Sequence, residues 1–430
     1  MLYKLLCTLL LIFCAASMPL AGDAAGITQY PKLVEADYWT AQNKDGDKLL
    51  LDAKGVQFFN AKVRAASRNV PDLLHYPATV SGDSLKTRIM DYLVLEDDLY
   101  LHGNKVSENY KNILRKQTNV GAIPATVTPR YAVTVRRSSL RNLPTGEGLF
   151  YYAAERNFDV LQETSLDPGE PLVVLHQSAN KYFYYVQSVN YSGWISTFNI
   201  AFTDKKTWQQ YADPDDFLVV TAANVSLKTS GEQVIYQQGA RLPLVSEQSD
   251  TYMVEAPVRS KTGLLQKQRL LLPRSAGVHK GYLPYTSNNI LRAAFAFYDM
   301  PYGWGGLKDS VDCSSLVFNA YRTVGVYLPR NADEQEEGAG TKKLLETLDD
   351  KQKTAAINSL RPGAALYMDG HVVLYLGQIN GVPYAIHSLG SYFSGGQRHV
   401  VMKVVVSDLS LQRSTGDSFL TDLRTAVEFK

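Results

Sequence analysis

The chain has 430 residues, of which 45% are hydrophobic and 20% charged, and its 44 lysines and arginines nearly balance 42 aspartates and glutamates. The length corresponds to about two to four domains. The composition is close to the globular average, which excludes a disordered, collagen-like or disulfide-dense chain. The formal net charge of +2 gives no bulk electrostatic reason to bind nucleic acid or an acidic membrane.

The first residues have the pattern of a secretory signal peptide. Lys4 precedes an apolar run at 5–13, and small residues follow at 15–17 and 21–24. The apolar run is shorter than the roughly 20 residues that a membrane-spanning helix needs. We therefore expect residues 1–24 to be removed, with cleavage near residues 21–24. The mature protein is expected to be periplasmic or extracellular, without a membrane span.

This signal peptide changes the cysteine count. The sequence has three cysteines, and Cys7 and Cys14 lie inside the segment that we expect to be removed. Cys313 is then the one cysteine expected in the mature protein, so no intramolecular disulfide is expected. A lone thiol in an exported protein is either buried and inert or retained for its reactivity.

Residues 25–124 are expected to form a mostly helical N-terminal domain. Apolar residues recur at three- and four-residue intervals over 81–114, which predicts helix there. His75 and His102 are isolated in the sequence, without other candidate ligands nearby. We therefore expect this part of the chain to have a structural role rather than a catalytic or ligand-binding one.

After a change of composition at 121–124, strand-forming residues and turn signals dominate to about residue 288. A weak internal repeat divides this stretch. A strand-like run at 133–135 is followed by a second one at 193–195. A similar pair of runs, with about the same spacing, occurs at 219–221 and 281–283. Two small β-barrels, over residues 125–212 and 213–288, fit this spacing. The alternative is a single larger β-sandwich.

Residues 289–430 have the order of elements expected of an α+β domain. Apolar periodicity predicts helices at 290–298, 313–324 and 342–348, and β-rich runs predict strands at 364–368, 372–376, 384–387 and 400–406. Helices followed by an antiparallel sheet are typical of the α+β class.

The pattern that carries chemistry begins with a glycine-rich stretch, 301–306, followed by Asp312, Cys313 and Ser314. An apolar stripe at 316–324 predicts a helix with Cys313 at or next to its N-terminus. The free N–H groups and the dipole at a helix N-terminus stabilise a thiolate, so we expect a lowered pKa for this thiol. The glycines are expected to allow a tight turn and the close approach of a substrate backbone.

Two histidines follow on predicted strands. His371 begins one strand, His387 ends the next, and Asn380-Gly381 between them is a hairpin turn signal. Adjacent antiparallel strands can bring the two imidazoles side by side. One can then act as general base and acid toward Cys313, and the second can orient the first. The order of cysteine helix and histidine strands matches papain-like peptidases.

Each residue also has a plainer interpretation. A lone cysteine is more often a small buried hydrophobe than a nucleophile, and either histidine taken alone is more often packed than catalytic. One cysteine and two histidines can also bind zinc, but the sequence has no close-spaced ligand pair. A serine hydrolase would need a G-x-S-x-G elbow, which is absent. We expect no metal and no cofactor.

Several separated motifs in residues 288–430 resemble the NlpC-type papain-like cell-wall peptidases. They are Tyr302-Gly303-Trp304-Gly305-Gly306, Asp312-Cys313-Ser314, the segment from Leu328-Pro329-Arg330 to Gln335, Arg361-Pro362-Gly363, His371-Val372 with Tyr375-Leu376-Gly377, and Ile386-His387-Ser388. The preceding repeat is similar to the two bacterial SH3-like barrels of one branch of that family, and the N-terminal part to a clip-like domain.

The resemblance implies hydrolysis of the γ-D-glutamyl–diamino acid bond in peptidoglycan stem peptides, with Cys313 as nucleophile, His371 as base and His387 as the orienting residue. It also implies fragments with a free N-terminal L-Ala as substrates. The residues implied to bind substrate or to stabilise the oxyanion are Asp312, Ser314, Tyr191, Tyr302, Trp304 and Glu170, of which Glu170 is an additional candidate for the ammonium pocket. The partners implied are stem peptides or muropeptides, and a monomer is expected.

Two residues depart from the pattern of this family. Ser315 stands where the family usually has glycine, and Ala332 where it usually has serine. The second change removes a hydroxyl near the expected substrate pocket. A lytic peptidase acting on intact peptidoglycan, with the barrels as wall anchors, is the alternative enzyme. A non-catalytic wall-binding protein is the alternative from another class.

Overall fold

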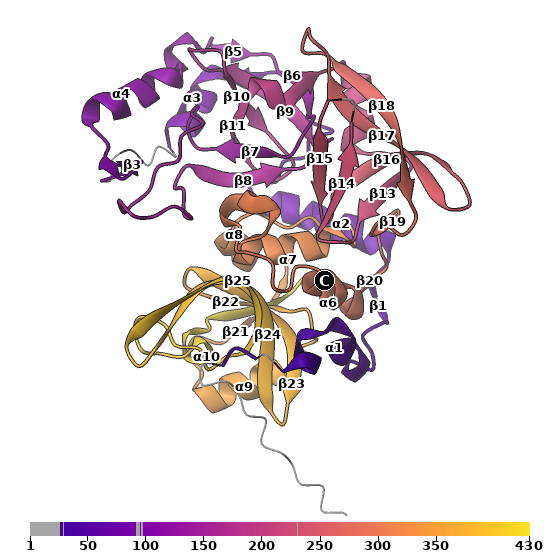
Figure 1. The fold of residues 1–430 in the computed structure, drawn as a ribbon, viewed down its shortest axis with the longest axis vertical. Helices are drawn as coiled ribbons and strands as arrows, with labels where there is room; N and C mark the ends of the chain where they lie inside the picture. Colours follow the sequence, from indigo (N-terminus) through magenta and orange to yellow (C-terminus); the bar gives the residue numbers. More distant parts are fainter. Residues whose placement is uncertain (1–25, 29, 92–94, 96–97, 230) are drawn as a thin grey trace, which may run out of the picture.

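The structure is a computed structural model, and it describes residues 26–28, 30–91, 95, 98–229 and 231–430. The expected signal peptide lies outside these residues. Two β units occupy one end of the long axis and a third sheet occupies the other, with helices α2 (Ala53–Ala66), α7 (Cys313–Arg322) and α8 (Ala332–Glu337) between them (Figure 1). None of the helices in the described part of the chain combines the length and apolarity needed to cross a bilayer.

The segment before residue 125 contains short helices and short strands. They are η1 (Pro31–Val34), α1 (Ala36–Gln42), β1 (Leu49–Leu51), α2, β2 (Val80–Ser81), α3 (Gly82–Met90), β3 (Tyr100–Leu101), β4 (Asn104–Lys105), α4 (Glu108–Gln117) and η2 (Val120–Ala122). The helix predicted over 81–114 is present as two helices, α3 and α4, because two serines each start one of them. Ser81 caps α3 and Ser107 caps α4, each by accepting a backbone N–H.

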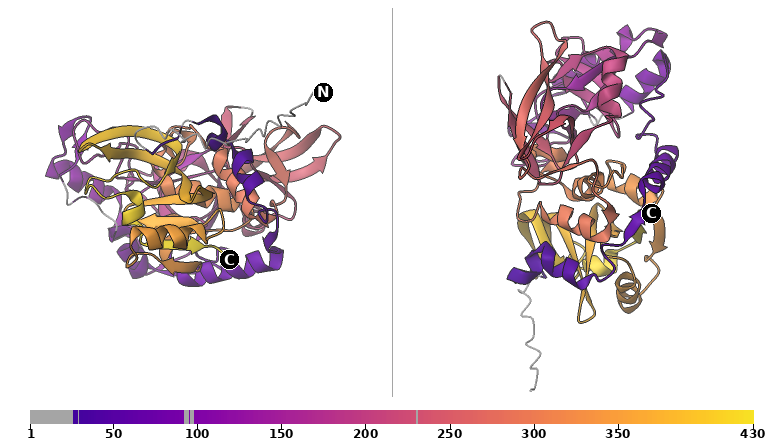
Figure 2. Two further views of the ribbon diagram at one scale, coloured as in Figure 1. Left: turned by 90° about the horizontal axis from the view of Figure 1, so that it is seen from below. Right: turned by 90° about the vertical axis from the view of Figure 1, so that its right-hand side faces the viewer.

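These N-terminal helices do not share one hydrophobic core. Trp39 of α1 and Phe59 of α2 are buried in the core of the C-terminal domain, whereas Leu85 and Ile89 of α3 are buried in the core of the first β unit. Figure 2 shows the segment running from the sheet at one end of the molecule to the β unit at the other. It therefore joins the two ends as a clip.

The first β unit is an antiparallel sheet in the order β12-β6-β9-β10-β11-β7-β8. Its strands are β6 (Arg130–Thr134), β7 (Ser138–Arg141), β8 (Gln162–Leu166), β9 (Pro171–Gln177), β10 (Phe183–Gln187), β11 (Ser192–Ser196) and β12 (Ile200–Phe202), preceded by β5 (Thr126–Val127), which pairs with β2, and followed by α5 (Lys205–Ala212). Alternate residues face inward, and the indole of Trp194 is fully buried.

The second β unit has its own hydrophobic core, built around Leu218, Tyr236 and Val254. Its strands are β13 (Phe217–Val220), β14 (Asn224–Lys228), β15 (Gln233–Gln237), β16 (Arg241–Glu247), β17 (Thr251–Arg259), β18 (Leu265–Pro273) and β19 (Val278–Lys280). They form the sheet β18-β17-β16-β13-β19 and the pair β14-β15. Separate cores favour two β units over the single larger sandwich.

The C-terminal domain places helices on both faces of an antiparallel sheet in the order β21-β26-β22-β23-β24-β25. Its elements are β20 (Tyr285–Thr286), α6 (Ser287–Phe295), η4 (Trp304–Asp309), α7, α8, β21 (Thr341–Leu344), α9 (Asp350–Asn358), β22 (Ala365–Met368), β23 (His371–Ile379), β24 (Val382–Ser394), β25 (Gln397–Asp408), α10 (Phe419–Asp422) and β26 (Thr425–Glu428). One core lies between the sheet and α6 and α7, and a second lies beneath α9 and α10.

The helix predicted at 342–348 is wrong. Residues 341–344 instead form the edge strand β21, in which Lys342 pairs with Val427 of β26. Lysines are tolerated on exposed edge strands, and ladder pairing outweighs the intrinsic helix propensity of this short run. The four predicted strands are present as β22 to β25.

Candidate active site

The N-terminus of α7 carries the candidate nucleophile. Asp312 caps the helix, accepting the Ser315 N–H at 2.9 Å, and the Ser315 hydroxyl accepts the Asp312 N–H at 2.8 Å. This reciprocal capping box fixes Cys313 as the first helical residue. The serine that departs from the family's glycine therefore has a structural role, because it supplies half of the cap.

The pKa of the Cys313 thiol is not lowered as the sequence predicts. Burial is the largest influence and raises this pKa to about 12, and the neighbouring Asp312 carboxylate raises it further. The backbone N–H groups of Val372 and Ser314 act in the opposite direction. Desolvation therefore outweighs the helix N-terminus, and the thiol is neutral in this substrate-free structure.

The hairpin predicted between the two histidines forms, and it brings the imidazoles together. Asn380 and Gly381 both have positive φ, as a tight hairpin turn requires. His371 Nε2 and His387 Nδ1 are 2.9 Å apart. Burial lowers the pKa of His371 to about 4 and that of His387 well below its usual range. Both rings are therefore neutral at pH 7.

The two ring nitrogens of His371 have different surroundings. Because Nε2 bonds to His387, Nδ1 is the nitrogen left for the thiol. Helix α7 packs against β23, and the N–H of Val372, the residue next to His371, interacts with the Cys313 sulfur. The arrangement thus provides a thiol, a neutral base and a second imidazole behind that base.

Tyr302 lies near Cys313, close enough for the two side chains to interact electrostatically. Burial and the neighbouring Cys313 raise the pKa of its phenol well above the usual range, so the phenol keeps its proton and can donate a hydrogen bond. Phe158, from the first β unit, packs against Tyr302 and against Trp304, with ring centroids 5.7 and 5.5 Å apart. The Trp304 indole donates to the Asp159 carbonyl at 2.9 Å. Trp304 therefore anchors the β unit to the site.

Both oxygens of the Asp312 carboxylate accept hydrogen bonds from the protein. Its Oδ2 accepts from Arg330 Nη2 at 2.5 Å and from the Gly305 N–H at 3.0 Å, while Oδ1 accepts from Ser315 and from the Ser314 hydroxyl. Burial alone would raise the pKa of Asp312, but the Arg330 guanidinium and these donors lower it. This carboxylate holds its neighbours in place rather than standing open to a ligand.

Arg330 connects this cluster to the first β unit. Its Nη1 donates to the Ser314 hydroxyl at 2.9 Å and its Nε donates to Thr164 Oγ1 at 3.0 Å. Thr164 follows Glu163, whose Oε2 accepts the Tyr191 hydroxyl at 2.5 Å. Tyr191 lies near Arg330, which acts on its phenol, and it lines a small pocket with Glu163 that includes none of the three candidate catalytic residues.

Glu163 is the residue that sequence reasoning missed. Burial raises the pKa of its carboxyl, and the bonds from Tyr191 and Asn142 only partly offset this. Its hydrogen-bond partners are neutral, and the guanidinium groups of Arg330 and Arg141 lie near enough to lower its pKa. An acidic residue is uncommon inside a strand, and that was the one signal that its sequence offered.

Glu170 does not join this cluster. Its Oε1 accepts from Arg322 Nη2 at 2.6 Å, and Arg322 also pairs with Asp167 at 3.2 Å. The predicted role of Glu170 in an ammonium pocket is therefore wrong, because a buried arginine on the far part of α7 neutralises it. The ion pairs of Arg322 with Asp167 and Glu170 instead join the first β unit to that helix.

The glycine-rich stretch packs against protein rather than against an open substrate site. Gly305 and Gly306 have φ of +56° and +78°, and a Cβ added there would meet Gln162 Cγ at 2.5 Å and Ser165 Cβ at 2.8 Å. The Gly305 carbonyl accepts from Gln162 Nε2 at 2.9 Å and Ser165 Oγ at 3.0 Å. These glycines let β8 of the first β unit approach the loop before Cys313.

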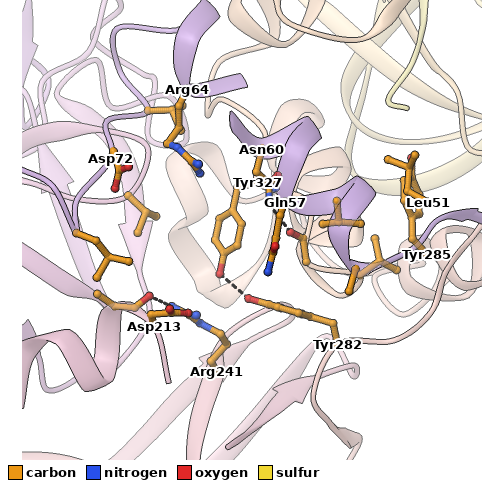
Figure 3. A pocket seen from close by; sticks show the side chains of 18 of the residues that line it. Leu51, Gln57, Asn60, Arg64, Asp72, Asp213, Arg241, Tyr282, Tyr285 and Tyr327 are labelled. Carbon is orange, nitrogen blue, oxygen red and sulfur yellow. Dashed lines mark hydrogen bonds between the residues drawn. The ribbon is translucent and has the colours of Figure 1, made fainter. Parts of the chain in front are cut away.

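A cavity of about 720 Å³ lies elsewhere, where the clip, both β units and the C-terminal domain meet. Figure 3 shows Gln57, Asn60 and Arg64 of α2 on one side, with the hydrogen-bonded phenols of Tyr282 and Tyr327 at its centre. None of the three candidate catalytic residues lines it. Within the described ranges, no group of three or more His, Cys, Asp or Glu side chains is arranged to hold a metal ion.

A thiol at the start of a buried helix, with two imidazoles on an antiparallel sheet packed against it, defines a papain-like cysteine hydrolase site. Comparisons with known proteins agree. Residues 299–401 match the model of the NlpC/P60 family, and residues 149–196 match that of an SH3 domain of the SH3b1 type. The chain thus contains an NlpC/P60 peptidase domain and an SH3-type domain.

The proteins similar to this chain include two relatives and a solved structure. Dipeptidyl-peptidase 6 of Lysinibacillus sphaericus is 25% identical over 49% of this chain and 75% of the relative. Gamma-D-glutamyl-L-lysine dipeptidyl-peptidase of Bacillus cereus is 26% identical over 34% of this chain and 43% of the relative. The NlpC/P60 endopeptidase of Photobacterium damselae subsp. piscicida has a TM-score of 0.72 at 19% identity, covering 90% of this chain and 95% of that one, and so shares the fold.

Proposed function

We propose that the protein is an exported cysteine endopeptidase that hydrolyses the γ-D-glutamyl–diamino acid bond of peptidoglycan stem peptides, acting on fragments with a free N-terminal L-Ala. The observation that carries the proposal is the hydrogen-bonded pair His371–His387 on strands packed against the helix that begins at Cys313. The printed names of the two relatives, a dipeptidyl-peptidase and a gamma-D-glutamyl-L-lysine dipeptidyl-peptidase, support the substrate class.

The proposed reaction uses the groups described above. His371 Nδ1 takes the thiol proton as the Cys313 sulfur attacks the γ-carbonyl carbon of D-Glu. The Tyr302 hydroxyl donates to the oxyanion that forms. The C–N bond then breaks, and the imidazolium returns its proton to the amine of the diamino acid. Water, activated by the same imidazole, hydrolyses the thioester and regenerates the thiol.

The restriction to free N-termini rests on the first β unit. A carboxylate is the natural partner of an ammonium group, and Glu163, bonded to the Tyr191 hydroxyl, offers one near which the only cations acting on its pKa, among the described residues, are Arg330 and Arg141. Arg330 and Ser314 connect this pair to the nucleophile helix. We therefore assign the ammonium of L-Ala to Glu163 and Tyr191, and to Asp312 the role of holding Arg330 and α7.

The remaining proposals concern the whole chain. We keep the division into a signal peptide at 1–24, a clip-like domain at 25–124, β units at 125–212 and 213–288 and a peptidase domain at 289–430. We infer that the second β unit is also SH3-like, supported by its separate core. Periplasmic or extracellular location and a monomeric state are proposed with it.

Product analysis tests the function. Purified full chain is incubated with L-Ala-γ-D-Glu-diaminopimelate and, separately, with intact sacculi, and Cys313→Ala is the matched control. We expect release of L-Ala-D-Glu from the tripeptide, none from sacculi, and no release by the variant. Activity on sacculi would favour the lytic peptidase, and no thiol-dependent activity on either would favour a wall-binding protein.

A further inference from the structure

The hydrogen-bonded chain that begins at His371 does not end at His387. The Nε2 of His387 lies 2.8 Å from the hydroxyl of Ser407 on β25. His387 and Ser407 are both 0% exposed, so bulk solvent does not reach this hydrogen bond. In the β24–β25 register His387 stands opposite Val405, and Ser407 is two residues further along on the same face.

The direction of the proton in each bond follows from what His371 must do. To accept the thiol proton, neutral His371 needs a lone pair on Nδ1, so its own proton is on Nε2. His371 Nε2–H then donates to His387 Nδ1. His387 consequently carries its proton on Nε2, and that N–H donates to the Ser407 oxygen.

The same His387 tautomer serves the next state of the reaction. When His371 becomes an imidazolium, its Nε2–H still donates to His387 Nδ1, and no proton on His387 has to move. The reverse direction, with Ser407 donating, puts the proton of His387 on Nδ1 and that of His371 on its Nδ1 as well. In that arrangement His371 has no lone pair for the thiol, and it is inactive.

We propose that Ser407 is a positioning residue, whose hydroxyl accepts the Nε2–H of His387 and so holds the His371–His387 pair in the tautomer that can deprotonate Cys313. This inference rests on the proposed function of these three residues. A hydroxyl suits the role because it orients the second imidazole without adding a charge next to it.

The surroundings of the pair offer no competing partner for His387 Nε2 among the described residues. Phe419 of α10 covers both rings edge-on, with centroids 5.6 Å from His371 and 5.9 Å from His387. The charged group that acts on His371 is Arg413, which is paired with Asp422 at 3.1 Å. Neither charged side chain is bonded to His387, which leaves the hydroxyl as its orienting group.

Nitrogen-15 NMR of histidine-labelled full chain tests the proposal without any substrate. At pH 7 we expect the wild-type His387 to be protonated on Nε2 and His371 to be protonated on Nε2. In Ser407→Ala we expect His387 to be no longer protonated on Nε2 alone. A wild-type His387 protonated on Nδ1 would overturn the proposal outright, whether or not any variant folds.

Kinetics provide the second readout. Ser407→Ala should lower kcat about 10- to 100-fold with KM little changed, less than the ~10⁴ lost with a charged orienting group in a Ser-His-Asp triad. Ser407→Thr, which keeps the hydroxyl, should recover most of the loss. Thr323→Val removes another fully buried hydroxyl of the same domain, bonded to a helix carbonyl, and should leave kcat unchanged.

The outcomes separate the two proposals. A wild-type protein without thiol-dependent activity would defeat the proposed function, while its NMR spectrum would still decide the tautomer. Unchanged kcat and an unchanged His387 tautomer in Ser407→Ala would defeat the role of Ser407 and leave the proposed function standing. A loss of kcat shared equally by Thr323→Val would show a general effect of removing buried hydroxyls, and would also contradict the proposal.

Discussion

At the scale of single residues, opposing influences act on Cys313. Its position at a helix N-terminus favours the thiolate, but burial and the nearby Asp312 favour the thiol and raise its pKa to about 12. Because His371 is also neutral, Cys313 and His371 do not form a thiolate–imidazolium pair before substrate binds. Proton transfer is then expected to accompany attack on the carbonyl carbon rather than to precede it.

This account predicts how Cys313 reacts with a simple alkylating agent. The rate of alkylation by iodoacetamide, followed at Cys313 by peptide mass mapping, should keep rising beyond pH 9 because a thiol with this pKa is scarcely ionised below it. A free cysteine in a short peptide, measured in parallel, should level off near pH 9. A plateau for Cys313 anywhere between pH 4 and 8 would show a preformed ion pair and contradict the account.

The three candidate catalytic residues could be predicted because their signals are local. A helix stripe follows Cys313, and a hairpin turn signal sets the strands of His371 and His387 side by side. The proposed ammonium site could not be predicted, because Glu163 comes near Arg330 only through the docking of a separate β unit. Glu170 lies on the same unit, and its sequence context does not reveal the buried Arg322 that neutralises it.

At the scale of elements, the glycine-rich loop and strand β8 form the junction between the β unit and the peptidase domain. The loop has positive φ at both glycines, and the strand donates two side-chain hydrogen bonds to one carbonyl. The same loop offers the Gly305 N–H to Asp312. Docking of the β unit and placement of the nucleophile helix are therefore coupled through a few atoms.

Replacing Gly305 with alanine should disturb this junction. The new Cβ would approach Gln162 Cγ to 2.5 Å, so we expect a loss of about 2–3 kcal/mol in the free energy of unfolding and a clear fall in kcat/KM. Gly395→Ala is the matched control, since Gly395 has φ of +57° and an added Cβ there would meet nothing within 4 Å. Equal losses in both variants, in urea unfolding and in activity, would mean that backbone strain alone is responsible.

The elements themselves were predicted best where periodicity and turns decide them, as in β22 to β25 and α7. The helix predicted at 342–348 was wrong because its residues pair with the C-terminal strand β26, a contact that local sequence does not contain. The helix predicted over 81–114 is divided for a different reason. Its apolar spacing is real, but Ser81 and Ser107 each start a separate helix, and the first of these ends at Met90.

At the scale of the whole molecule, the clip holds the two ends together by burying its side chains in both. Trp39 lies in the core of the peptidase domain, and Leu85 lies in the core of the first β unit. Because both cores contain clip residues, we expect the SH3-type domain and the peptidase domain to unfold together rather than one at a time.

The buried histidines give this unfolding a pH dependence. The pKa of His371 is about 4 in the folded protein and about 6.5 when unfolded, so the unfolded state binds more protons between these values. The contribution of His371 to stability should therefore be complete above pH 6.5 and fall by about 2–3 kcal/mol as the pH drops to 4, and the lowered pKa of His387 adds a loss of the same sign. Urea unfolding between pH 4 and 8 measures it.

Two variants test whether the active-site histidines cause this pH dependence of stability. His371→Gln should reduce the pH dependence without abolishing it, because burial still lowers the pKa of His387, whereas His399→Gln, at an exposed position, should leave it as in the wild type. Stability that rises as the pH falls from 6.5 to 4 would contradict a buried neutral imidazole pair.

The central claim is that the β unit selects peptides by their free amine while Cys313 cleaves them. The most direct test compares kcat/KM for L-Ala-γ-D-Glu-diaminopimelate with kcat/KM for its N-acetylated form. The wild type should prefer the free amine by about 100-fold or more, as expected for a buried charge pair of roughly 3 kcal/mol. Glu163→Gln should remove most of that preference. Equal values for the two peptides in the wild type, with Cys313→Ala inactive on both, would contradict the claim.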